Sequence, residues 1–118
     1  MAKSWLQKYG TYEEVVVGAD TGITAFAGGD QINATQLTKK FNQVDNCAND
    51  YDSVKLDSAL TGKLQTVFNN TIKLLSVYPV SGQVINGVVD YEFVIGPGDA
   101  IDFKSISSGK IKASGTSL

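Results

Sequence analysis

The chain contains no histidine and no arginine, and Cys47 is its only cysteine among 118 residues. Without histidine, Ser-His-Asp and Cys-His catalytic arrangements and most zinc sites are excluded. A single cysteine cannot form an intrachain disulfide, which argues against a secreted, disulfide-stapled domain and is typical of synthesis in a reducing cytoplasm. Because no base or cation lies beside Cys47 in the sequence, an inert thiol is favoured over a nucleophile.

Positive charge is also scarce: the chain has ten lysines and twelve acidic residues, which gives a net charge of −2. Sequence-independent nucleic-acid binding requires cations concentrated against phosphate, and the lysines form no such block, so no nucleic-acid partner is expected. No window approaches the ~18 apolar residues of a membrane span. The N-terminus, MAKSWLQKYG, lacks the apolar core of a signal peptide. We therefore expect no membrane partner.

Acidic residues are the remaining candidates for chemistry. The aspartates Asp45, Asp50, Asp52 and Asp57 lie within thirteen residues, and such a cluster could bind Ca²⁺ through oxygen ligands. The cluster lacks the alternating spacing, central glycine and closing glutamate of an EF-hand loop, so a solvated, turn-forming loop is favoured. Short loops also leave little room for a substrate cleft between two catalytic carboxylates. We expect no enzymatic activity, no metal and no cofactor.

Short β segments dominate the chain from residue 52 onward. Runs such as 62–70, 73–78 and 91–95 recur about every 8–12 residues and are bounded by Gly, Asn, Asp or Pro. This spacing is typical of an antiparallel sandwich or barrel. The predicted fold is mainly all-β: a compact antiparallel β-sandwich or jelly-roll-like domain over residues 19–118, with an N-terminal arm and at most one short helix.

Residues 33–48 include the one candidate helix. Asn33 is a good N-cap, and Leu37, Phe41 and Val44 follow at i, i+4 and i+7, on one face of a helix. Threonine and asparagine are frequent here and form helices poorly. A short turn followed by a strand from about Phe41 is therefore an open alternative to a helix over residues 33–44.

Residues 1–18 form an N-terminal arm that differs in composition from the rest. It contains the chain's only tryptophan, Trp5, followed by Leu6, Tyr9 and Tyr12 and then by three consecutive valines. A chain end with such aromatic residues is unusual unless it is tied down. Two interpretations stay open: the aromatic residues pack on the domain's own core, or the arm docks on a neighbouring subunit.

In the stretch LLSVYPVSGQVINGVVDYEFVIGPG, residues 74–98, apolar segments are closely interrupted by turn-forming Pro, Gly and Asn residues. Proline cannot donate a ladder hydrogen bond, glycine adopts positive φ at low cost, and Asn-Gly is the strongest short hairpin signal. A meander of compact hairpins is therefore predicted, with no bulky active-site loop. Its predicted structural turn residues are Pro79, Gly82, Asn86, Gly87, Pro97 and Gly98.

The same stretch resembles a segment of small structural proteins of tailed bacteriophages, in which the pattern VYP-x-SG-x-x-ING precedes further short strands. Upstream, TAFAGGDQINATQLT at residues 24–38 and DSVKL at residues 52–56 are similar as well, so the resemblance covers roughly residues 24–113. The chain departs from the pattern at Asp57, at residues 90–92 and at Ile111, which are expected at the surface or at strand ends.

The resemblance implies a virion structural protein, and the role it most favours is head decoration. Such a cement protein is made in the bacterial cytoplasm, binds the outside of the shell, and bridges neighbouring copies of the major capsid protein, here as an expected homotrimer. Since aromatic residues dominate interface energetics, Trp5, Leu6, Tyr9 and Tyr12 are the predicted oligomer or capsid contacts.

Three alternatives stay open, the third being a small enzyme. The first is a neck, tail or fibre-attachment component that uses the same β module elsewhere in the virion. The second is a carbohydrate-binding β module, which solvent-exposed Tyr51, Tyr78 or Tyr91 would favour. A small enzyme would require a perturbed carboxylate pair in a cleft.

Overall fold

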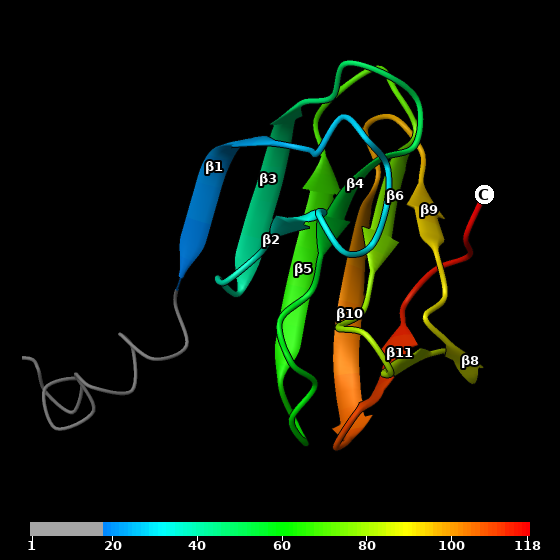
Figure 1. Cartoon of the computed structure of the whole chain (residues 1–118). Coiled ribbons are helices and arrows are strands. Elements are labelled where there is room, and N and C mark those ends of the chain that lie inside the picture. The colour runs from blue at the N-terminus through cyan, green and yellow to red at the C-terminus, as the bar shows by residue number, and fades with distance from the viewer. Residues whose placement is uncertain (1–17) are drawn as a thin grey trace, which may run out of the picture.

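The computed structural model describes residues 18–118, which fold into two β-sheets without any helix (Figure 1). The larger sheet has the strand order β1-β3-β5-β10-β11-β7-β8, and the smaller has the order β2-β4-β6-β9. The strands of the larger sheet are β1 (Ala19–Thr24), β3 (Phe41–Asn46), β5 (Leu64–Asn69), β7 (Val84–Ile85), β8 (Val88–Val89), β10 (Ala100–Ser107) and β11 (Lys110–Ala113). Those of the smaller sheet are β2 (Thr35–Gln36), β4 (Asp52–Lys55), β6 (Leu75–Tyr78) and β9 (Phe93–Ile95).

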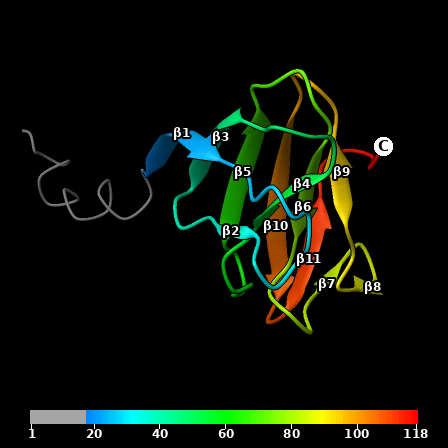
Figure 2. The ribbon, with the colours of Figure 1, turned by 45° about the horizontal axis from the view of Figure 1, so that its top comes forward.

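From β1 to β6 the chain crosses from one sheet to the other after every strand. β1, β3 and β5 pair in parallel in the larger sheet, and β2, β4 and β6 pair in parallel in the smaller one. Each odd-even pair of strands is therefore one coil, and the coils stack on one another as in a short β-solenoid. β10 and β9 then pair antiparallel with β5 and β6 and cover that end of the stack (Figure 2).

The prediction of an all-β domain is confirmed, but the antiparallel, jelly-roll-like arrangement is wrong for the first half of the domain. Inward and outward residues alternate with the same period in parallel and antiparallel strands, so the pattern does not distinguish them. Parallel neighbours are usually joined by helices. Here each parallel connection instead runs through a strand of the opposite sheet, so the pairing was not recognisable from helices between the strands.

Of the two alternatives left open for residues 33–44, the structure shows the strand from Phe41 and no helix. β2 occupies Thr35–Gln36 and β3 occupies Phe41–Asn46. Leu37 and Val44 are both buried, at 1% and 0% exposure, which explains why their spacing resembled one helical face. They reach the core from opposite sides because the chain turns between them.

The core lies between the two sheets. Val44 of β3 and Val67 of β5 are fully buried on the inner face of the larger sheet. Phe93 of β9 packs edge-to-face on Phe103 of β10, with 5.2 Å between ring centroids. Because these two strands belong to different sheets, the aromatic pair joins the sheets directly and adds about 0.5–1.5 kcal/mol beyond burial.

The smaller sheet is covered on its outer face as well. Ser53, Ser76 and Val94 point away from the core by alternation, yet all three are buried. Residues 25–34 cross this face (Figure 1), where the Ser53 hydroxyl donates to the Asp30 carbonyl oxygen at 2.8 Å and the Tyr78 hydroxyl donates to the Gly29 carbonyl oxygen at 3.2 Å. The chain's last residues cover Val94, whose N–H donates to the Ser117 hydroxyl at 2.8 Å. In the described part, the larger sheet alone therefore leaves one face open.

Asn69, at the end of β5, holds a corner where the chain changes sheets. Its side chain is fully buried, and Nδ2 donates to the carbonyl oxygens of Lys73, Ile95 and Gly96 at 2.7, 3.0 and 3.1 Å. Its Oδ1 accepts a hydrogen bond from the Thr71 hydroxyl at 2.7 Å. One amide thus satisfies backbone groups that the sheet ladders leave without partners.

Gln65 does the same at the other end of β5. Its Nε2 donates to the Lys39 carbonyl oxygen at 3.0 Å, and its Oε1 accepts from the Asp57 N–H at 2.8 Å. The amide group of Asn42 on β3 adds a second donor to the Lys39 oxygen, at 2.9 Å. Inward-facing amides therefore close both ends of the coil.

We predict that Asn69→Leu lowers the free energy of unfolding by about 2–4 kcal/mol, because three buried carbonyl groups lose their donor. Chemical denaturation measures the change. The matched control is Asn49→Leu, since Asn49 is exposed and its side chain makes no hydrogen bond within residues 18–118. Equal stability of the two variants would show that the amide does not hold the corner.

Candidate binding surfaces

The four arm residues predicted to make contacts, Trp5, Leu6, Tyr9 and Tyr12, lie outside the described residues. The described chain begins at Gly18, whose carbonyl oxygen accepts a hydrogen bond from the N–H of Phe41 at 2.8 Å. The arm is therefore attached to the domain at the β1 edge of the larger sheet.

The predicted turn residues of the stretch 74–98 lie between consecutive strands. Asn86 and Gly87 join β7 to β8 with φ values of 50° and 85°, the backbone of a type I′ hairpin turn. The Asn86 side chain also accepts a hydrogen bond from the Ala113 N–H at 2.9 Å, which ties the hairpin to β11.

The other turn residues follow strands of the smaller sheet. Pro79 comes directly after β6, and its carbonyl oxygen accepts from Nε2 of Gln31 at 2.8 Å. Gly82 reverses the chain before β7 with a φ of 88°. Pro97 and Gly98 lie between β9 and β10, where Gly98 has a φ of 78°. These residues shape the backbone and carry no chemistry of their own.

Asp45 of the acidic cluster binds parts of three successive coils. Its carboxylate accepts hydrogen bonds from the Gly22 N–H, the Asn70 amide and the Gln43 amide at 2.5, 2.6 and 2.9 Å. The bond from Asn70, followed by those from Gln43 and Gly22, lowers the pKa of Asp45. The charge thus links β1, β3 and the segment that follows β5.

Asp52 and Asp50 hold the turn between β3 and β4. Asp52 accepts from the N–H groups of Ala48 and Asn49, both at 3.0 Å, and Asp50 accepts from the Leu74 N–H at 3.0 Å. Each carboxylate is directed at backbone donors, and within residues 18–118 no three Cys, Asp or Glu side chains converge on a possible metal position.

Cys47 is half-buried beside the same turn, and its Sγ lies 3.2 Å from the carbonyl oxygen of Asn49. Burial, and then the negative charge of Asp52, raise the pKa of the thiol. Reactive cysteines have a lowered pKa in a positive environment, so this environment is opposite to that of a nucleophile.

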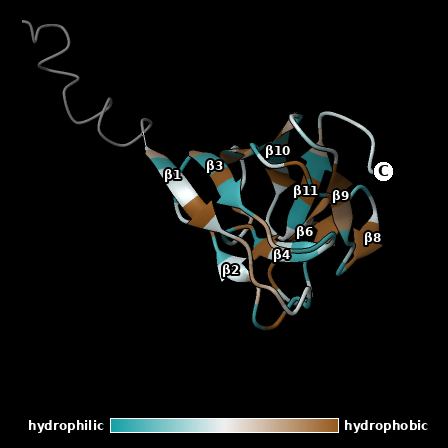
Figure 3. Ribbon diagram, turned by 90° about the horizontal axis from the view of Figure 1, so that it is seen from above, coloured by the Kyte–Doolittle hydropathy of each residue, from teal (hydrophilic) through white to brown (hydrophobic). Residues whose placement is uncertain are grey.

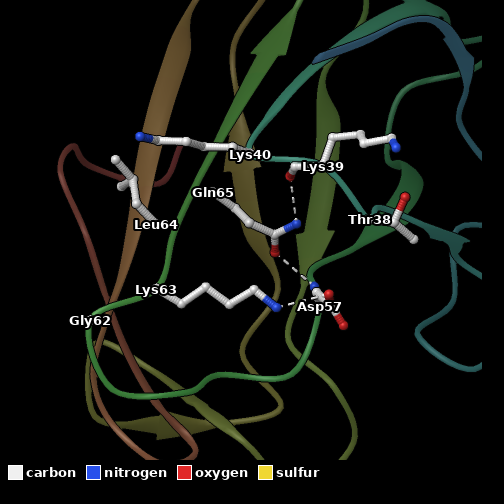
Figure 4. A pocket seen from close by; sticks show the side chains of 8 residues that line it. All are labelled: Thr38, Lys39, Lys40, Asp57, Gly62, Lys63, Leu64 and Gln65. Carbon is white, nitrogen blue, oxygen red and sulfur yellow. Dashed lines mark hydrogen bonds and ion pairs between the residues drawn. The ribbon is translucent and has the colours of Figure 1, made fainter. Parts of the chain in front are cut away.

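A hollow of about 380 Å³ opens between the ends of β3 and β5 (Figure 4). Lys39 and Lys40 point away from each other, and Lys63 pairs with Asp57 at 2.8 Å. Both ends of the Gln65 amide bind backbone groups. Because the ammonium groups do not converge and the carboxylate is neutralised, the hollow is suited neither to acid-base chemistry nor to tight anion binding.

The aromatic residues that would favour glycan binding are arranged unequally. Tyr51 is 48% exposed and has a φ of 71°, which is rare for a bulky residue. The Tyr78 hydroxyl donates to the Gly29 carbonyl oxygen at 3.2 Å, and burial raises its pKa. Tyr91 packs edge-on against Phe93, with 6.4 Å between centroids. These three residues therefore do not form a shared stacking platform.

An apolar surface that the sequence did not reveal lies at the β8 edge of the larger sheet. Val88, Val89 and Ile106 are 49%, 58% and 59% exposed. β8 is the terminal strand, and it is coloured as hydrophobic at the side of the molecule opposite β1 (Figure 3). The Asn-Gly pair predicts a hairpin here, and only the tertiary structure shows that its second strand forms an edge.

Comparison with known proteins gives no named relative: no family model, no curated protein and no solved structure matches the chain. Among residues 18–118, no helix is long and apolar enough to span a membrane. The described surface includes the open face of the larger sheet and the exposed apolar edge, and the sequence adds the aromatic residues of the arm.

We predict that Lys63→Met raises the titration midpoint of the Asp57 carboxyl, followed by NMR. The hydrogen bond from Lys63, and then that from the Ser58 N–H, lower the pKa of Asp57 in the folded protein. Stability from this pair is therefore present above the unfolded-state pKa and is lost as pH falls through the folded-state pKa. Both groups are partly exposed, so the gain is at most about 1 kcal/mol.

Lys39→Met is the matched control, because Lys39 lines the same hollow without pairing with Asp57. If both variants shift the Asp57 midpoint equally, the effect comes from general charge and not from the ion pair.

Proposed function

We propose that the protein decorates the head of a tailed bacteriophage, where it binds the outside of the shell and bridges neighbouring capsid subunits. The observation that carries the proposal is the resemblance of roughly residues 24–113 to small phage virion proteins, above all in the stretch of residues 74–98. That stretch forms compact turns around β6 to β9 and holds no group placed for catalysis.

The proposed mechanism is bridging. An expanded shell must resist the pressure of packaged DNA, and a protein bound across a seam adds contact area between the subunits on either side. Linking several copies in one assembly, such as a trimer, raises the effective concentration of each further contact. The stacked coils suit this role because the buried amides of Asn69 and Gln65, on the larger sheet, hydrogen-bond to Ile95 of the smaller sheet and to Asp57 just after it.

The arm supplies the proposed anchors. It joins the domain at Gly18, on the outermost strand of the larger sheet, so it leaves from one side of the molecule. Seventeen residues can extend over roughly 55–60 Å, which is enough to reach across a neighbouring subunit. Trp5, Leu6, Tyr9 and Tyr12 are the residue types that contribute most at interfaces.

We predict that Trp5→Ala lowers occupancy on shells at least tenfold, because loss of a central aromatic anchor costs about 2 kcal/mol or more. Phage particles lacking the protein are mixed with purified full-length variants, and bound copies are counted by quantitative mass spectrometry. Tyr51→Ala is the matched control, since it also removes an exposed ring but lies in the folded domain.

The outcomes separate two failures. If the wild-type protein does not bind the particles at all, the decoration role is wrong. If Trp5→Ala binds as well as wild type, shell binding stands but the arm is not its anchor. Unchanged circular dichroism of both variants shows that the domain remains folded.

A further inference from the structure

The outer side of the β7–β8 hairpin is an open, apolar edge. β8 ends the larger sheet, so one side of it has no neighbouring strand within residues 18–118. The Asp90 N–H donates back to Gln83 across the hairpin at 2.9 Å, and peptide groups alternate in direction, so those of Val89 face away from β7. Native proteins rarely leave such an edge uncovered, because it pairs readily with another chain.

A hollow of about 430 Å³ lies beside this edge. Val84 and Ile106 provide apolar walls, while Lys110 and Lys112 add two positive charges. Neither lysine has an acidic partner within the described residues, and no carboxylate lines the hollow. Val84 lies opposite Val89 and beside Lys110 in the sheet, so the hollow and the edge form one continuous surface.

We propose that this surface binds the segment Glu13-Glu14-Val15-Val16-Val17 of a second copy of the chain. The segment offers two carboxylates for the two lysines and three valines for the apolar walls and the β8 edge. Valine favours the extended conformation that such an edge accepts. Charge and hydrophobicity are thus complementary along the whole segment.

The segment cannot come from the same copy. Gly18 is fixed beside Phe41 by the 2.8 Å backbone hydrogen bond, and Val15 is only three residues away from Gly18, or about 10 Å. β1 and β7 are separated by five strand spacings of ~4.8 Å, about 24 Å in all. The two places lie on opposite sides of the molecule (Figures 1 and 3). The valines must therefore reach another molecule.

This contact is head-to-tail, since each copy donates from its β1 side and accepts at its β8 side. Such contacts close into rings when the rotation between copies permits it. A ring of three copies joined by these contacts would be the expected trimer. The aromatic residues at the start of the arm take no part in the contact and stay available for another partner. The contact joins copies whatever the assembly binds, so it is tested separately from the proposed role on the shell.

The test is a charge swap in the full-length protein, followed by sedimentation velocity over a range of concentrations. Glu13→Lys with Glu14→Lys, and separately Lys110→Glu with Lys112→Glu, are expected to weaken self-association at least tenfold. The quadruple variant is expected to recover most of the wild-type association. Lys39→Glu with Lys40→Glu is the control, because it changes charge equally on a different part of the surface and leaves association unchanged.

Cysteine pairing provides a second measurement. In a Cys47→Ser background, a Val16→Cys chain mixed with a Val84→Cys chain is expected to form a mixed disulfide, whereas a mixture with an Ile72→Cys chain is not. The proposal is overturned if the wild-type protein stays monomeric, if either charge reversal leaves association unchanged, or if the swap does not restore it. Equal disulfide yields at Val84 and Ile72 also overturn it.

Discussion

The structure depends on hydrogen bonding at the corners, where the chain leaves one sheet and enters the other. Each crossing takes backbone groups out of the sheet ladders, and a domain of this size has few residues with which to satisfy them. Asn69 and Gln65 do so from the inside. Asp45 accepts from one further backbone N–H, that of Gly22 in the neighbouring coil. With these bonds in place, two parallel stacks are held face to face around a continuous core.

The same constraint explains why the polar residues carry no assembled chemistry in the described part of the chain. Asp45, Asp50 and Asp52 bind backbone N–H groups or side-chain amides at the turns, and Asp57 pairs with Lys63. Their hydrogen-bonding capacity is used to hold the fold. The proposed binding role rests instead on an open sheet face, an apolar edge and the aromatic residues of the arm.

The sequence predicted the short strands, and the Asn86-Gly87 pair does join two of them in a hairpin. Parallel pairing was not predictable, because alternation of apolar residues is the same in either direction. Leu37 and Val44 have the spacing of one helical face, and both are buried. They enter the core from different sides, which the spacing does not show. The position of β8 at a sheet edge was not predictable either, because it depends on strand order, which no local pattern contains.

The proposed role on the phage head is tested most directly by the number of copies of this protein in purified particles, measured by quantitative mass spectrometry against the major shell protein. The account predicts a copy number comparable to that of the shell subunit, as decoration of the whole head requires. A copy number that is a small fraction of the shell's would place the protein in the neck or tail, and absence from the particles would contradict the virion role altogether.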